Sequence, residues 1–166
     1  MDYQPEQPEQ DPATRIIDIQ LDEKSIAIAA AEVEHERKVA IFDLLENNLF
    51  VLEDGTPGPY RVRLAITEKR LCFEIAGENG APITSFLFSL SPFSKLIKDY
   101  FLVCGSYYDA IKTAPPSRIE ALDMGRRALH DEGSHLLIQR LRGKIRTDFE
   151  TGRRLFTLVC ALHWRG

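Results

Sequence analysis

The sequence lacks the features that identify many functional classes. Its 166 residues include only three cysteines, Cys72, Cys104 and Cys160, and no pair of them has a Cys-x-x-Cys spacing. An odd number of widely spaced cysteines argues against a disulfide framework or a zinc knuckle, and it is typical of a reducing compartment. There is also no Rossmann fingerprint, glycine-rich phosphate loop, H-E-x-x-H or G-x-S-x-G motif. We therefore expect no metal and no cofactor.

Long hydrophobic segments are also missing. No apolar run approaches the roughly 20 residues that a membrane-spanning helix needs. The first residues do not combine a basic region with an apolar stretch, so the sequence shows no signal peptide. From these two absences we expect a cytoplasmic protein without a membrane partner.

The composition predicts one domain behind a short tail. Residues 1–14 are rich in proline, glutamine and acidic side chains, and such a segment has nothing to pack. The whole chain is 44% apolar, which is near the average of globular proteins. We expect a disordered acidic tail over residues 1–14 and a single α+β domain over residues 15–166.

The net charge of −4 conceals an asymmetry. Residues 1–113 have a net charge of −8, and residues 114–166 have a net charge of +4. A basic C-terminal third could bind an anionic ligand or nucleic acid, or it could face the acidic part of its own chain or of a second subunit. Nucleic acid is the least expected partner, because the chain as a whole is acidic.

Alternation of apolar and polar residues predicts strands in the first half of the chain. A turn of residues 54–59 and the Asn79-Gly80 pair, which accepts positive φ, separate these segments into an antiparallel meander. Arg61 or Arg63 is expected opposite Glu74 on the outer face of the sheet. The predicted strands cover residues 17–21, 49–52, 62–66, 71–75 and 83–90, and one helix is predicted from about residue 32 to residue 47.

The second half has the spacing of helices. Apolar residues recur at steps of three and four after Ser91, until Ala114-Pro115-Pro116 ends the helix. Gly105 inside this helix suggests close approach by another backbone. A second helix opens at Ser117, is expected to break at Gly133-Ser134 and restarts through Leu141. The last helix, from near Asp148, is apolar nearly all round and should be central.

These elements together predict an α+β fold. We expect a small antiparallel sheet of about four to five strands, packed against about four to five helices, with a helical C-terminal half.

Three arginines are candidates for binding a ligand. Arg126 lies on the apolar stripe of its helix, where a guanidinium needs a partner. That partner could be a carboxylate such as Glu36 or Asp99, or it could be the phosphate or carboxylate of a ligand. The same question arises for Arg37, between two apolar turns, and for Arg154, which precedes the buried part of the last helix.

Two histidines and a tyrosine complete the candidates. His130 belongs to the segment His130-Asp131-Glu132-Gly133-Ser134-His135, which could move protons or could be an ordinary polar helix junction. His35 lies between two glutamates and could have the same role or lie at the surface. Tyr100, on a helix rich in core residues, could line a ligand site, the core or a dimer interface.

Several segments resemble a known family. They include Val33-Glu34-His35-Glu36-Arg37, Ser106-Tyr107-Tyr108, Asp123-Met124-Gly125-Arg126-Arg127 and Arg153-Arg154-Leu155-Phe156. Over about residues 15–166 the chain is similar to a serially numbered family of uncharacterised alphaproteobacterial proteins. The resemblance implies a single-domain cytosolic protein, and it implies no catalytic residue. The acidic tail departs from the family's pattern, as does Asp131, where the pattern has asparagine.

Three hypotheses about function remain from the sequence. The first is a non-catalytic protein that binds an anionic ligand or another protein, with possible self-association, through Arg126, Arg37, Arg154 and Tyr100. The second is a small enzyme acting on an anionic metabolite, in which Arg126 and Arg154 hold the anion and His130 or His35 moves a proton. The third and weakest is nucleic-acid binding by the basic C-terminal third.

Overall fold

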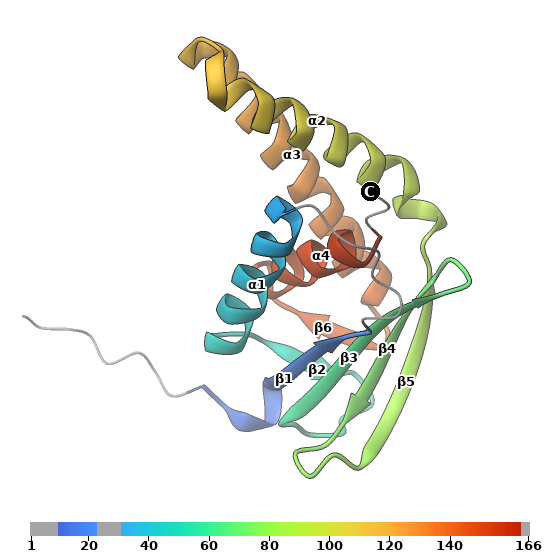
Figure 1. Ribbon diagram of the computed structural model, residues 1–166. Coiled ribbons are helices and arrows are strands. Elements are labelled where there is room, and N and C mark those ends of the chain that lie inside the picture. Colours follow the sequence, from blue (N-terminus) through green and yellow to red (C-terminus); the bar gives the residue numbers. More distant parts are fainter. Residues whose placement is uncertain (1–9, 23–30, 164–166) are drawn as a thin grey trace, which may run out of the picture.

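The chain folds into a small mixed sheet, a two-stranded sheet and four α-helices (Figure 1). This computed structural model describes residues 10–22 and 31–163. Residues 1–9 of the expected tail lie outside the described part, and Pro12–Thr14 form the 3-10 turn η1. The strands are β1 (Ile16–Leu21), β2 (Phe50–Leu52), β3 (Tyr60–Thr67), β4 (Arg70–Ala76), β5 (Pro82–Ser89) and β6 (Ile145–Thr147). The helices are α1 (Ala31–Glu46), the 3-10 turn η3 (Ser91–Phe93), α2 (Ser94–Thr113), α3 (Pro116–Leu141) and α4 (Phe149–His163).

The predicted α+β class is confirmed, with one correction to the sheet. Its strand order is β1-β3-β4-β5, and the β3-β4-β5 meander is antiparallel as expected. β1, however, runs parallel to β3. The segment between them contains α1 and β2, and it returns the chain to the end of the sheet at which β1 began. The sheet is therefore mixed, not purely antiparallel. Arg63 is the residue that lies opposite Glu74, with Nη1 and Oε2 3.1 Å apart.

A second small sheet joins distant parts of the chain. β2 pairs in antiparallel fashion with β6, a strand of three residues that the sequence pattern did not predict. Ile145 is buried opposite Leu52, and the next two residues of β6, Arg146 and Thr147, are more exposed. The short pairing brings the C-terminal end of α3 and the start of α4 beside the loop after α1.

The helices α1 and α4 cover one face of the main sheet, and the opposite face carries Arg61, Arg63 and Glu74 in contact with solvent (Figure 1). The expectation of a central last helix is confirmed, since nine residues of α4 are buried. Large side chains with relative exposure below 2% fill the space between the layers, among them Phe50, Tyr60, Phe73, Phe93 and Phe156. None of the described helices is long and apolar enough to cross a membrane.

The helices α2 and α3 form a long antiparallel hairpin that extends away from the sheet (Figure 1). The prediction that α3 breaks at Gly133-Ser134 is wrong, because the helix continues through both residues to Leu141. A Cβ atom at Gly133 would overlap the ring of Phe156 on α4, so this glycine permits close packing of two helices. The opposite correction applies to Gly105, where a Cβ would meet no atom within 4 Å.

These two glycines give a matched pair of substitutions. Gly133→Ala should lower the free energy of unfolding by about 1–3 kcal/mol, because the new methyl group displaces the Phe156 ring from a packed core. Gly105→Ala should raise it by up to about 1 kcal/mol through helix propensity alone. Urea unfolding followed by circular dichroism measures both. Equal effects of the two substitutions would contradict the close packing of α3 on α4.

The first residue of β1 is held by a buried side chain. Asn48, which is 2% exposed, accepts a hydrogen bond from the amide of Ile16 at 2.8 Å and donates to the carbonyls of Ile16 at 3.0 Å and Leu44 at 2.8 Å. One amide side chain thus joins the sheet to the end of α1. Because it both donates and accepts, no carboxylate can reproduce its three bonds.

Asn48→Asp should therefore destabilise the protein by about 2–4 kcal/mol at neutral pH, because a buried carboxylate oxygen would face two carbonyl oxygens. The matched control is Asn79→Asp, at an exposed turn where the side chain only accepts a bond from Ala81. That change should stay within about 0.5 kcal/mol in the same unfolding measurement. A small effect at Asn48 would show that the three-bond clamp is not needed.

Candidate functional site

A cavity of about 640 Å³ lies between α1, α3 and α4, with one residue from α2. It brings together five of the six residues that the sequence suggested for ligand binding or proton transfer. Aromatic and aliphatic groups from α1, α2 and α4 share the lining with charged ones. The five converging residues are His35, Tyr100, Arg126, His130 and Arg154.

Arg37, the sixth candidate, does not line this cavity. Its guanidinium forms an ion pair with Glu34 one turn earlier on α1. The two apolar turns around it on the sequence do not place it in the core, because α1 presents a narrower apolar face than its pattern suggests, and only Ala40 and Leu44 of this helix are buried.

Arg126 lies in a network that joins three helices. Its Nη2 donates to Asp123 at 2.6 Å, and its Nη1 is 3.7 Å from Oε1 of Glu36 on α1. The same Glu36 oxygen accepts a hydrogen bond from the hydroxyl of Tyr108 on α2 at 2.5 Å. The Arg126 guanidinium also lies 4.5 Å from the ring centre of Tyr107. Of the two carboxylates that the sequence proposed for Arg126, the structure selects Glu36.

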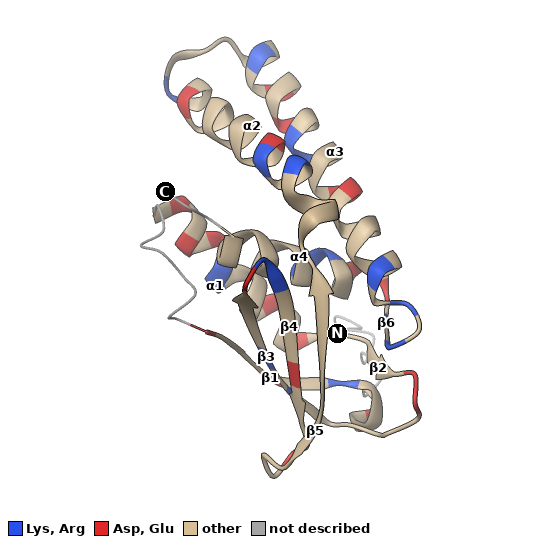
Figure 2. Cartoon of the chain, turned by 90° about the vertical axis from the view of Figure 1, so that its right-hand side faces the viewer, with Lys and Arg blue, Asp and Glu red and all other residues tan. Residues whose placement is uncertain are grey.

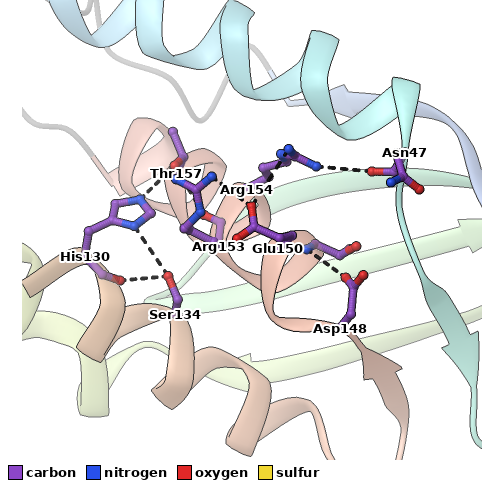
Figure 3. Close-up of polar contacts among 9 residues, drawn as sticks. Asn47, His130, Ser134, Asp148, Glu150, Arg153, Arg154 and Thr157 are labelled. Atoms are coloured by element: carbon purple, nitrogen blue, oxygen red, sulfur yellow. Dashed lines mark hydrogen bonds and ion pairs between the residues drawn. The ribbon is translucent and has the colours of Figure 1, made fainter. Parts of the chain in front are cut away.

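A second cluster lies on the first two turns of α4 (Figure 3). Glu150 Oε2 is 2.9 Å from Nη2 of Arg153 and 3.9 Å from Nη2 of Arg154. Arg154 also donates to the backbone carbonyl of Asn47 at 3.2 Å. The Glu150 carboxylate, whose side chain is 54% exposed, therefore forms ion pairs with two guanidinium groups.

His130 is packed among aromatic rings beside this cluster. Its ring centre is 5.1 Å from that of Phe156 and 5.5 Å from that of Tyr100. Nε2 lies 2.8 Å from the hydroxyl of Thr157, and Nδ1 lies 3.4 Å from the hydroxyl of Ser134 (Figure 3). The Ser134 hydroxyl donates to the His130 carbonyl at 2.7 Å, so it cannot also donate to the ring.

These surroundings keep the imidazole neutral. Burial lowers the pKa of His130 to about 4, the positive charge of Arg153 acts in the same direction, and Asp131 opposes both. With this pKa the ring is a neutral imidazole at neutral pH, so the imidazolium that would act as a general acid is scarce and the ring is a weak base. His130 therefore suits a hydrogen-bonding role in the cavity better than a role in proton transfer.

The other candidates differ in their exposure. His35 is exposed at the rim of the cavity on α1, and Tyr100 is only 4% exposed. Burial and the nearby Glu36 carboxylate raise the pKa of Tyr100, so its hydroxyl stays protonated. Among the described residues, no group of three or more histidine, cysteine or acidic side chains could hold a metal ion.

A profile of the uncharacterised protein family UPF0262 matches residues 13–165. The chain belongs to this family. A UPF0262 protein of Nitrobacter hamburgensis is 54% identical over 159 residues, which cover 96% of this chain and 97% of the relative. A UPF0262 protein of Bradyrhizobium sp. strain ORS 278 is 55% identical over 161 residues, covering 96% and 95%. The resemblance to an alphaproteobacterial family is thereby confirmed. No solved structure matches the chain.

Sequence reasoning assigned no role in the site of this UPF0262 member to three residues of α4, although it noted Arg153 beside Arg154. Arg153, Glu150 and Thr157 all line the cavity. Their spacing is the available signal, because positions 150, 153, 154 and 157 share one face of a helix at steps of three and four. That face is the polar interruption in a helix that is otherwise apolar nearly all round.

The low pKa of His130 predicts a pH effect on stability in this UPF0262 protein. An unfolded histidine has a pKa near 6.5, so between about pH 6.5 and pH 4 the unfolded chain binds a proton that the folded chain does not. The stability is fully present above this window and is lost as the pH falls through it, by on the order of 3 kcal/mol. His130→Gln should remove this loss, as measured by urea unfolding at pH 7 and pH 4.5. The control is His135→Gln, an exposed imidazole on the same helix, and an equal change in that variant would contradict the assignment to His130.

Proposed function

We propose that this UPF0262 protein binds a small anionic ligand, carrying a phosphate or carboxylate group, in the cavity between α1, α3 and α4. The observation that carries the proposal is the position of Glu150 between Arg153 and Arg154. A carboxylate of the chain itself occupies the place between two guanidinium groups where a ligand carboxylate or phosphate would bind. Planar guanidinium groups suit both of these anions.

The charged side chains that line the cavity determine how an anionic ligand can bind there. Its lining contains four arginines and four carboxylates, the latter being Glu36, Asp43, Asp131 and Glu150. A ligand anion therefore cannot simply enter an unpaired positive site and has to replace an existing carboxylate. Glu150 is the member to leave, because its side chain is 54% exposed and an exposed ion pair contributes at most about 1 kcal/mol.

Binding is favoured over catalysis by the state of the histidine. The enzyme hypothesis needs a group that gains and loses a proton near neutral pH, and it named His130 and His35 for this role. Burial lowers the pKa of His130 to about 4, and His35 lies exposed at the rim, so the buried part of the cavity offers no such histidine. His130 and Thr157 would instead form hydrogen bonds near the bound anion. As part of the same proposal we place the protein in the cytoplasm, in line with the free thiols of its three cysteines.

A thermal-shift experiment tests the proposal with inorganic phosphate, citrate and a nucleoside monophosphate as probes, each compared with sodium chloride at equal ionic strength. At about 100 times the Kd, a specific ligand should raise the Tm by roughly 5–10 °C. Arg154→Gln should abolish this rise, since it removes one of the two guanidinium groups. Arg146→Gln, on an exposed position of β6 outside the cavity, is the matched control and should keep it. A rise of equal size in the Arg154 variant, or no rise with any probe, would refute anion binding at this place.

A further inference from the structure

The two edges of the main sheet differ in how they are protected. At the β1 edge the Asn48 side chain forms hydrogen bonds with both the amide and the carbonyl of Ile16. It thereby makes the bonds that a neighbouring strand would make at this residue. The remainder of β1 carries the polar residues Asp18 and Gln20. Charged or covered edges of this kind prevent pairing with other chains.

In the part of the chain that the structure describes, the β5 edge has no side-chain clamp and no charged residue, and its proline, Pro82, is confined to the first position of the strand. Pro82–Ser89 contains no charged residue, and Figure 2 shows the strand in tan along its length, without blue or red, in front of the other elements. β5 is also at the margin of the molecule in Figure 1. Within the described residues, β4 is its one strand neighbour. A long, uncharged edge strand that is not covered is a template for pairing with another strand.

The hydrogen bonds of β5 show which backbone groups remain for such pairing. The Leu90 amide donates across to the Lys69 carbonyl, next to the β4 pairing of Ser89 with Arg70. Backbone groups of successive residues point to opposite edges of a strand, so those of Phe88 and Phe86 face β4. The amide and carbonyl groups of Ser85, Leu87 and Ser89 therefore face the open edge.

We infer that a second copy of this chain pairs with this edge, β5 against β5 in antiparallel orientation about a two-fold axis at Leu87. In this register Leu87 lies opposite Leu87 of the second copy, and Ser85 lies opposite Ser89. All the open amide and carbonyl groups of these residues then find partners. The two four-stranded sheets become one continuous sheet.

The side chains of β5 favour this occupant over an unrelated segment. Leu87 is 53% exposed, and the two-fold axis places it against the same apolar side chain of the other copy. On the inner face, Phe86 lies opposite Phe88 of the second copy, which extends the aromatic contact that these two rings already make within one chain at 6.3 Å. The strand itself has no charged residue, so it brings no like charges of its own together on pairing with a second copy. The Lys144 ammonium lies 5.2 Å from the Phe86 ring and 5.9 Å from the Phe88 ring of its own chain, where it makes cation–π contacts. The inference concerns a surface away from the cavity and does not depend on the proposed function.

The mass of the full-length protein in solution is the first measurement, by light scattering across a range of concentrations. A dimer is expected, and Leu87→Lys should convert it to a monomer because it places two ammonium groups directly opposite each other. Leu102→Lys, which changes a 62% exposed leucine on α2, should leave the dimer intact. Circular dichroism checks that both variants are folded.

Hydrogen exchange of the wild-type protein tests the register without any variant. In the dimer the amides of Ser85, Leu87 and Ser89 should be protected, and this protection should decrease on dilution. The amides of Phe86 and Phe88 should be protected at every concentration through their bonds to β4. A protein that is monomeric at all concentrations, or a dimer in which the Leu87 amide exchanges freely, would overturn the inference.

Discussion

The close approach of α3 to α4 at Gly133 is the constraint on which the rest of the structure depends. The ring of Phe156 occupies the space that a Cβ atom at position 133 would need. Gly152 makes the same kind of contact from the other side, since a Cβ there would lie 2.5 Å from the side chain of Ile138. Two glycines, one on each helix, thus set the distance between the helices.

The short distance between α3 and α4 determines where the side chains of the cavity lie. His130 comes three residues before Gly133, and Thr157 comes directly after Phe156, so the contact that joins the helices also brings Nε2 of His130 within 2.8 Å of the Thr157 hydroxyl. The same packing surrounds the imidazole with Phe156 and Tyr100 and lowers its pKa to about 4. The chemistry open to the cavity follows from helix packing, since a histidine on a looser helix pair would remain hydrated and would titrate near neutral pH.

Much of this arrangement could be predicted from local patterns. The strands of the meander, the first turn of α4 and the extent of α2 all follow periodicity and proline positions, because these signals act within a few residues. The parallel pairing of β1 and the short strand β6 could not be predicted, since both depend on partners 40 residues or more away in the chain. Gly133 was misinterpreted as a helix break because local propensity disfavours glycine in helices, and the tertiary contact with Phe156 outweighs that preference.

In the candidate site, too, local patterns predict some features, and others depend on contacts between distant parts of the chain. Helical spacing could identify Arg126 as a residue in need of a partner, but it could not choose between Glu36 and Asp99, and the structure shows Glu36. The convergence of His35, His130 and Arg154 on a single cavity is a property of the fold alone. Arg37 and Arg126 each pair with a carboxylate three residues earlier on their own helix, Glu34 and Asp123, and Arg126 alone of the two also contacts Glu36 and lines the cavity.

The charge asymmetry of the sequence acquires a structural meaning from these pairings. The basic C-terminal third meets the acidic first part of the chain through Arg126 and Glu36, and it meets the carbonyl of Asn47 through Arg154. Within α4, however, one exposed carboxylate serves both Arg153 and Arg154. Four arginines and four carboxylates line the cavity, so its charges balance, and Glu150, with a 54% exposed side chain, is the carboxylate that an anion could replace. An anion that replaced Glu150 would meet the Arg154 guanidinium, which the Asn47 carbonyl already holds by a hydrogen bond of 3.2 Å, so binding would lose little to ordering that group.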